Sequence, residues 1–173
     1  MTMPLFETPH LICRRLQQGD GDALLAVYGD GEAMRWVGDG KPLTHEQCAE
    51  WIEVTTRNYA ARGYGMSALE LRWTGAVIGF CGLVHPGGQT EPEVKYALLS
   101  AYWGQGLATE AVRALIAYAF EIFHLTHLQA TVYPENKASQ RVLTKAGLRP
   151  EETRHNEDSS TTHIFAWYAS EEQ

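Results

Sequence analysis

Two glycines stand close together in the segment Trp103-Gly104-Gln105-Gly106-Leu107-Ala108-Thr109-Glu110, at the start of the most strongly helical stretch of the chain. The first turn of an α-helix has four backbone N–H groups without a partner inside the helix, and glycine leaves such groups uncovered. With the positive end of the helix dipole, they can bind an anion without basic side chains. A tight turn that simply needs glycine would explain the same residues.

Two nucleotide-binding motifs do not fit this segment. A P-loop ends in Gly-Lys-Ser or Gly-Lys-Thr, and the segment contains neither. A dinucleotide-binding fingerprint needs a third small residue where this chain has Thr109, and it needs an early parallel β-α-β unit. A phosphate-binding turn of another type therefore stays open beside the simple tight turn.

A second segment, residues 132–148, places polar groups at the start of another helix. Asn136 stands at the predicted N-terminus, and Ser139 lies one turn later on the same side. Taken alone, an N-cap role for Asn136 and a solvated hydroxyl for Ser139 are the simpler interpretations. Gly147 is predicted to end this helix, with Pro150 just beyond it.

Together, the two segments resemble the GNAT superfamily of acetyl-CoA-dependent N-acetyltransferases, and most closely its ribosomal-protein N-terminal (Rim-type) branch. Residues 103–111 are similar to the cofactor motif of that branch, and Asn136 to Leu148 is similar to its Asn-x-x-Ser helix. Leu11 to Leu16 resembles its first strand. The similarity covers nearly the whole chain, so we expect a single GNAT-like domain over residues 1–173.

The resemblance implies how CoA would be held. Backbone amides from Trp103 to Ala108 would bind the pyrophosphate, the pantetheine would pair with the end of the strand before them, and the second segment would line the thioester end of a V-shaped slot. The residues assigned to the cofactor are Leu98, Leu99, Trp103, Gly104, Gln105, Gly106, Leu107, Ala108, Thr109, Asn136 and Ser139.

Acetyl transfer to an amine also needs a base, because a primary amine with a pKa of about 10 to 11 is mostly protonated at neutral pH. The resemblance points to Glu93 as this base, acting directly or through water. Glu157 or Asp158 approximates a second acidic position of the family. The amides of Leu98 and Leu99 are expected to stabilise the oxyanion.

The proton donor to the leaving thiolate is less clearly marked. Many family members carry a tyrosine seven residues after the asparagine, and this chain has Leu143 there. Ser139 is the nearest hydroxyl and is our candidate for the role. His124 and His127 straddle a helix end without a cysteine or carboxylate partner, so no metal is expected.

These residues predict an acetyl-CoA-dependent N-acetyltransferase that acts on a primary amine by direct attack in a ternary complex. A non-catalytic CoA-binding sensor or interaction module is the alternative, and Leu143 is the feature that favours it. Loops such as Gly38 to Pro42 and Glu157 to Ser160 carry no pattern that identifies the amine, so a protein N-terminus and a small-molecule amine both stay open.

The hydrophobic pattern places the candidate residues on a series of strands and helices. It indicates an α/β fold of the α+β type, GNAT-like, with a mixed, largely antiparallel sheet of about seven strands, about four helices and a splay between the fourth and fifth strands. The predicted strands are Leu11–Leu16, Met66–Leu71, Ala76–Val84, Val94–Leu99, Leu128–Tyr133, Glu151–His155 and Thr162–Ala169. The predicted helices begin near Asp20 or Asp22, Thr44, Gly106 and Asn136.

The composition of the chain excludes some classes of binding partner. The 173 residues carry a formal net charge of −7, which argues against a general binder of nucleic acid or anionic membranes. Three widely spaced cysteines indicate a reducing compartment, and the absence of a signal peptide or a long apolar run points to the cytoplasm. A monomer and a homodimer are both compatible with the sequence.

Overall fold

The computed structural model describes residues 3–36 and 40–170, which form an eight-stranded sheet in the order β1-β2-β3-β4-β5-β6-β8-β7. Strands β5 and β6 are parallel, and every other neighbouring pair in this sheet is antiparallel. The predicted mixed, largely antiparallel sheet is therefore confirmed. The strands are β1 (Pro4–Glu7), β2 (Leu11–Arg15), β3 (Met66–Leu71), β4 (Val77–Val84), β5 (Glu93–Leu98), β6 (His127–Val132), β7 (Arg149–His155) and β8 (Thr161–Tyr168).

Strand β1 is the element that the sequence pattern does not reveal. It has four residues, begins with Pro4 and lies at the edge of the sheet, where a proline is tolerated. Its register against β2 shifts between Pro4 and Phe6. So short and irregular a strand shows no clear alternation, so the pattern predicts about seven strands where the sheet has eight.

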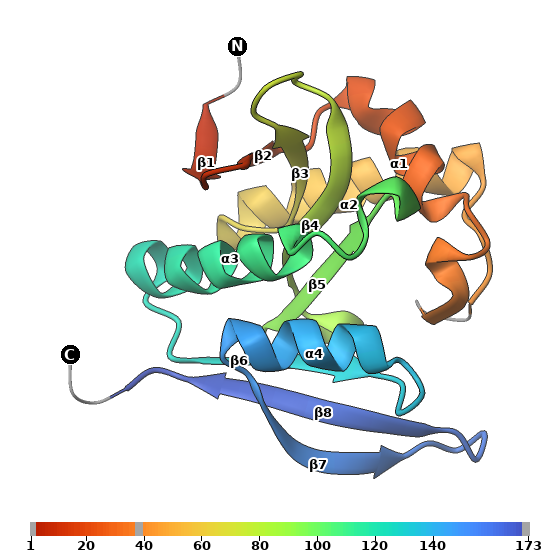
Figure 1. The fold of residues 1–173 in the computed structure, drawn as a ribbon, viewed down its shortest axis with the longest axis vertical. Coiled ribbons are helices and arrows are strands. Elements are labelled where there is room, and N and C mark those ends of the chain that lie inside the picture. The colour runs from red at the N-terminus through yellow and green to blue at the C-terminus, as the bar shows by residue number, and fades with distance from the viewer. Residues whose placement is uncertain (1–2, 37–39, 171–173) are drawn as a thin grey trace.

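The described residues form four α-helices, which cover the two faces of the sheet (Figure 1). One pair packs on one face and the second pair packs on the other, so each face has its own apolar core. Leu115 and Leu143 belong to the core beneath the second pair, and Ile52 and Phe80 belong to the core beneath the first. The first pair is α1 (Gly21–Tyr28) and α2 (His45–Arg62), and the second pair is α3 (Leu107–Phe123) and α4 (Lys137–Ala146).

Helices α1 and α2 both begin where the sequence predicts, but only α2 has a side-chain cap. Thr44 Oγ1 accepts a hydrogen bond from the Gln47 amide, and Gln47 Oε1 accepts one from the Thr44 amide, which closes a capping box. Asp20 precedes α1, but its carboxylate accepts hydrogen bonds from the Arg14 guanidinium and the Gln17 amide. Asp20 therefore ties β2 to the start of α1 and makes no side-chain cap.

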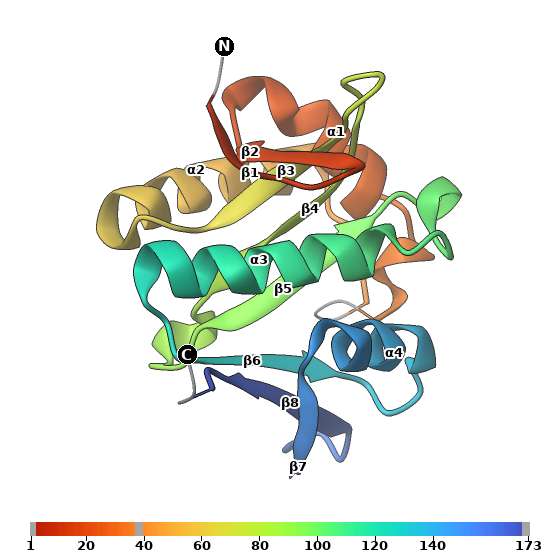
Figure 2. The same ribbon diagram turned by 60° about the vertical axis from the view of Figure 1, so that its left-hand side comes forward.

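Strands β5 and β6 share one ladder pair, Glu93 opposite Gln129, and then diverge (Figure 2). Both strands have six residues, so most of their facing edges are not paired with each other. The sheet opens here as a V whose apex is at Glu93 and whose mouth is at Leu98. This confirms the predicted splay.

Helix α3 begins at the mouth of the V. Val112, Leu115 and Ala119 lie on one stripe of the helix and are buried against the sheet. The helix starts after Gly106 and ends at Phe123, and the next residue, His124, has a left-handed backbone with φ of +55°. The sheet and this helix therefore bring the carboxyl end of β5 and the amino end of α3 to one place.

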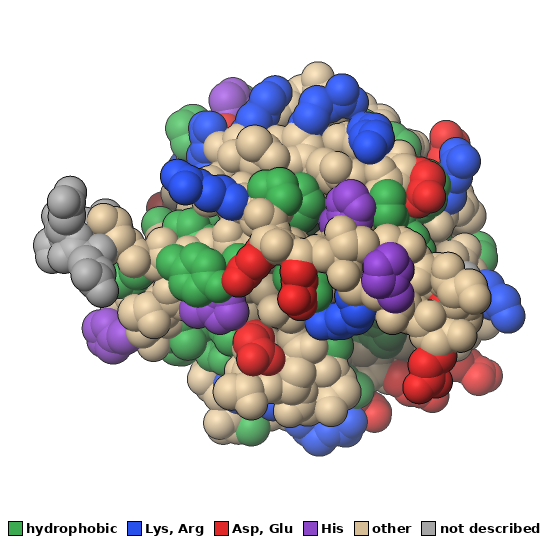
Figure 3. Space-filling model, turned by 90° about the horizontal axis from the view of Figure 1, so that it is seen from below, with side chains coloured by type: hydrophobic (Ala, Val, Ile, Leu, Met, Phe, Trp, Pro, Cys, Tyr) green, Lys and Arg blue, Asp and Glu red, His purple; other side chains and the backbone are tan. Residues whose placement is uncertain are grey.

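The surface around the last hairpin carries mixed side chains. Seen from below, acidic, basic, histidine and apolar side chains are interspersed (Figure 3). All seven residues of β7 are exposed, and they include charges of both signs. None of the helices formed by residues 3–36 and 40–170 is both long and apolar enough to cross a membrane.

Candidate active site

The turn between β5 and α3 exposes a row of backbone N–H groups. Gly104 and Gly106 have φ angles of +74° and +79°, which glycine adopts without strain. A Cβ at either position would meet no heavy atom within 4 Å, so the space over both glycines is open. Within the described part of the chain, the N–H groups of residues 104–109 donate to no protein acceptor. We call residues 104–109 the amide turn.

The amide turn has the properties of an anion site. Helix α3 has 17 residues and directs the positive end of its dipole at the turn. N–H donors, an open space and this dipole together suit phosphate oxygens. The turn therefore fits the pyrophosphate that the resemblance predicts, and a hollow that reaches Gly106 and Thr109 is also lined by Arg113 and Lys145.

Trp103, at the edge of the turn, differs from its predicted role. Its amide donates to the Ser100 carbonyl oxygen at 3.1 Å. Its indole Nε1 donates to the Leu98 carbonyl oxygen at 2.8 Å, and the side chain is about half exposed. Because the Trp103 amide already has an acceptor, the row of open donors begins at Gly104 and not at Trp103.

The backbone of β5 presents alternate amides to the V. The Leu99 amide donates to the Ile78 carbonyl oxygen at 2.8 Å, which directs it toward β4. Backbone donors alternate in direction along an antiparallel pair, so the amides of Tyr96 and Leu98 point the other way, toward β6. The expectation for Leu98 agrees with this direction. The expectation that Leu99 contributes its amide to the slot is wrong, because β4 already occupies that donor.

The start of α4 combines a cap and a hydroxyl. The Asn136 side chain caps the helix by accepting a hydrogen bond from the Ser139 amide at 3.2 Å. The Ser139 hydroxyl lies 2.5 Å from the phenol oxygen of Tyr96 on β5. The second segment of the sequence therefore faces β5 across the V, and its serine has a tyrosine partner.

Tyr96 was not singled out by the sequence analysis. Alternation along β5 places it on the face of Val94 and Leu98, beneath α3 and α4. Burial raises its pKa to about 12, although the hydrogen bond with Ser139 works in the opposite direction. The phenol is therefore protonated at neutral pH. Leu143, where many relatives of the family have tyrosine, is buried in the core.

Glu93 lies at the apex of the V. Its side chain is almost fully buried, and Oε2 is 3.0 Å from the Lys95 ammonium nitrogen. Glu93 and Tyr96 are three positions apart on one strand, so their side chains project from opposite faces of the sheet. Glu93 is thus on the side of α1 and α2, and it has a counter-ion.

The two other acidic candidates lie in a different environment. Glu157 and Asp158 are exposed in the turn between β7 and β8. Hydrogen bonds from the hydroxyl and amide of Ser160 hold the pKa of Asp158 below its usual range. A fully solvated carboxylate with these partners is less suited than Glu93 to accept a proton in a closed slot.

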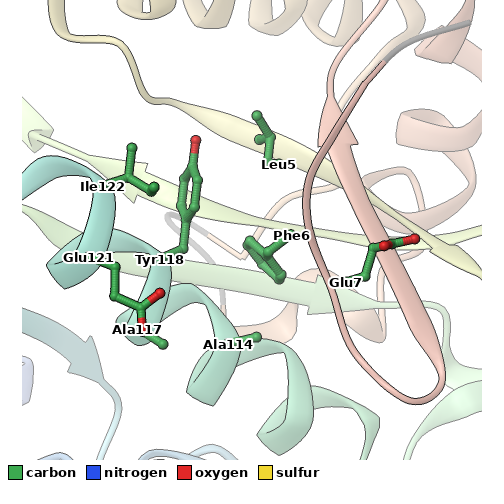
Figure 4. A pocket seen from close by; sticks show the side chains of 8 residues that line it. All are labelled: Leu5, Phe6, Glu7, Ala114, Ala117, Tyr118, Glu121 and Ile122. Atoms are coloured by element: carbon green, nitrogen blue, oxygen red, sulfur yellow. The ribbon is translucent and has the colours of Figure 1, made fainter.

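Two further features lie apart from the V. In the described residues, no group of three or more histidine, cysteine or acidic side chains could hold a metal ion, and the His127 ring stacks on Tyr168 at 4.6 Å. A shallow hollow between β1 and α3 is lined by Phe6, Tyr118 and Ile122, among others (Figure 4). It contains none of the predicted site residues.

A sheet that opens beside an amide turn at a helix N-terminus is what the resemblance leads us to expect of an acetyltransferase. Residues 10–149 match the family described as Acetyltransferase (GNAT) domain. The chain therefore belongs to the GNAT acetyltransferase family and is an N-acetyltransferase, as the two sequence segments predict.

Several proteins are similar to this one over nearly their whole length. The uncharacterized protein YkkB of Bacillus subtilis (strain 168) is 37% identical over 151 residues, which cover 84% of this chain and 86% of YkkB. The acetyltransferase from Agrobacterium tumefaciens str. C58 matches with a TM-score of 0.82 and 25% identity, covering 97% of this chain and 96% of that one. RimL, a ribosomal L7/L12 alpha-N-protein acetyltransferase solved with CoA, has the same fold, with a TM-score of 0.82, 15% identity and coverage of 96% and 98%.

Proposed function

We propose that this protein transfers the acetyl group of acetyl-CoA to a primary amine by direct attack in a ternary complex. The observation that carries the proposal is the amide turn, with its open donors at the mouth of the V. Bound there through its pyrophosphate, CoA would extend its pantetheine along β5 between the two diverging strands. Acetyl-CoA supplies the activated thioester, and no metal takes part.

Glu93 is the proposed base. An amine must lose a proton to attack the thioester, and a buried carboxylate at the apex of the V can accept it directly or through water. Lys95 lies 3.0 Å from Glu93 and balances its charge, which lowers the cost of keeping a carboxylate in a buried position. Because Glu93 projects toward α1 and α2, we propose that the amine arrives from that side of the sheet.

The amides of Tyr96 and Leu98 are the proposed oxyanion donors. They point into the V, whereas the Leu99 amide points toward β4. When the amine attacks, negative charge builds on the thioester oxygen, and fixed N–H donors stabilise it without reorganisation. Ser139, on the other arm of the V, is the proposed donor of a proton to the departing thiolate.

The amine acceptor is either a protein N-terminus or a small molecule. The RimL neighbour acts, by its name, on the α-amino group of a ribosomal protein, and the likeness to RimL is one of fold. Gly38 and Asp39, the first two residues of the loop Gly38 to Pro42, lie outside the described part of the chain. A panel of peptides with free N-termini, polyamines, amino acids and aminoglycosides would separate these classes.

A thiol-release assay with acetyl-CoA and this panel tests the proposal. We expect free CoA to appear only when both acetyl-CoA and a suitable amine are present, together with an acetylated amine in the mass spectrum. Binding of CoA without turnover on any amine would favour the alternative, a sensor or interaction module that has lost catalysis. If the protein does not bind CoA, both the proposed acetyltransferase and the CoA-binding sensor are excluded.

A further inference from the structure

The phenol of Tyr96 and the hydroxyl of Ser139 join the two arms of the V. Tyr96 belongs to β5, and Ser139 belongs to α4, which packs on β6 and α3. Their oxygen atoms are 2.5 Å apart, and the phenol oxygen also lies 3.4 Å from the Ser139 carbonyl oxygen. The side chain that meets Ser139 therefore comes from the opposite side of the slot.

The inventory of protons limits how this pair can act. Each hydroxyl has one proton and can also accept a hydrogen bond. When the phenol proton points at Ser139 Oγ, the Ser139 proton is free to point elsewhere. The Ser139 carbonyl oxygen competes for the single phenol proton, but at 3.4 Å it is a poorer acceptor than Ser139 Oγ at 2.5 Å. Tyr96 thus turns the Ser139 proton away from itself.

We propose that Tyr96 is a positioning residue. Its phenol directs the Ser139 proton at the sulfur of the departing thiolate and then gives its own proton to Ser139 Oγ. This inference rests on the proposed acetyl transfer. As the C–N bond forms and the C–S bond breaks, the sulfur takes the electron pair of the broken bond and the Ser139 proton. Ser139 Oγ takes the phenol proton in the same event, and water returns a proton to Tyr96 when the products leave.

The two faces of β5 divide the proton transfers. Glu93 and Tyr96 project from opposite faces, so the amine would lose its proton on the side of α1 and α2, and the sulfur would gain one on the side of α3 and α4. Burial raises the pKa of Tyr96 to about 12, so the phenol carries its proton at neutral pH and can donate it to Ser139 Oγ. Leu143 provides no hydroxyl at the family's usual tyrosine position, and β5 supplies a phenol in its place.

The test is a double-mutant cycle of Tyr96→Phe and Ser139→Ala, with the amine that the wild-type protein acetylates best. Phenylalanine keeps the ring and its packing and removes only the hydroxyl. We expect each single variant to lower kcat by about 100-fold, the scale of a lost general acid, while KM for acetyl-CoA changes by less than about twofold. The double variant should be no slower than about half the rate of the slower single variant, because both changes break one relay.

Tyr118→Phe is the matched control, since Tyr118 is a partly buried tyrosine on the same side of the sheet but lines the hollow between β1 and α3 (Figure 4). We expect its kcat to stay within twofold of wild type. Two results would overturn the relay. One is a Tyr96→Phe variant with wild-type kcat, and the other is a double variant whose loss of kcat equals the product of the two single losses. A wild-type protein that acetylates no amine would overturn the proposed function and this inference together. A wild-type protein that acetylates an amine, with a Tyr96→Phe variant of equal kcat, would overturn this inference alone.

Discussion

The indole Nε1 of Trp103 donates a hydrogen bond to the carbonyl oxygen of Leu98, 2.8 Å away, across the turn that leads from β5 into α3. The Trp103 amide donates to Ser100 in the same turn. One side chain thus fixes the end of the strand relative to the first open N–H group of the amide turn. The indole organises the site through the backbone, although the residue offers no amide of its own.

Replacing Trp103 with Phe should therefore weaken CoA binding. A hydrogen bond of this kind contributes about 1 kcal/mol, so we expect Kd for CoA to rise about fivefold in isothermal titration calorimetry. Trp51→Phe is the control, because Trp51 packs on Tyr28 in the core of α1 and α2, on the opposite face of the sheet from α3. Equal CoA affinity in Trp103→Phe and wild type would show that the indole does not organise the amide turn.

Gly106→Glu should abolish CoA binding. The new side chain would enter the open space over the turn, add a negative charge where phosphate is proposed to bind, and strain a backbone with φ of +79°. Gly75→Glu is a matched control, because Gly75 has φ of +72° and open space in the turn between β3 and β4. Calorimetry should detect CoA binding to Gly75→Glu and none to Gly106→Glu. Retention of affinity by Gly106→Glu would exclude the amide turn as the phosphate site.

Glu93→Gln should slow turnover most at neutral pH. A lost general base costs about 100-fold, and the loss should shrink as the pH approaches the amine pKa of about 10, where free amine becomes abundant. Steady-state kcat between pH 6.5 and 9.5 measures this recovery. Glu91→Gln, an exposed neighbour in the loop before β5, should follow the wild-type profile. If Glu93→Gln also follows it, Glu93 is not the base.

Asp20→Asn should destabilise the fold without touching the V. Burial acts to raise the pKa of Asp20, but its bonds with the Arg14 guanidinium and the Gln17 amide lower it below the usual range. Two 2.9 Å contacts with Arg14 would weaken, so we expect a loss of about 2 kcal/mol in urea unfolding at pH 7. Asp22→Asn, on a side chain that is 98% exposed, should change little.

The lowered pKa of Asp20 also predicts whether the protein becomes more or less stable as the pH falls. Unfolded chains bind a proton at an aspartate near pH 4, and folded Asp20 binds it only at lower pH. Between these values the unfolded state holds more protons, so wild-type stability falls with decreasing pH. The wild-type protein should therefore lose its advantage over Asp20→Asn as the pH falls below about 4. A stability difference that stays constant from pH 7 to pH 3 would contradict this assignment.

Much of the site follows from local sequence. The glycines predict the amide turn because their positive φ angles and missing side chains are properties of single residues. The start of α2 at Thr44 and the Asn136 cap of α4 are also local, and both occur as predicted. Family membership follows from two such segments at the expected separation.

Other parts of the site depend on register and rotamers. Whether the Leu99 amide faces the V is decided by its pairing with Ile78 on β4, which neither strand encodes alone. The contact between Tyr96 and Ser139 joins residues 43 positions apart, and it requires both the divergence of the strands and the position of α4. Trp103 has an acceptor 2.8 Å away because the turn folds its indole back onto β5.

Because β5 and β6 share only the ladder pair of Glu93 and Gln129, the sheet consists of two parts that are weakly joined through the backbone. One part runs from β1 to β5, and the other consists of β6, β8 and β7. Continuous ladders make each part cooperative, whereas few backbone hydrogen bonds link one part to the other. We expect deuterium to enter the two parts as separate opening units in hydrogen-exchange experiments. A CoA molecule seated in the V would bridge them, so its binding should make the sheet open as one unit.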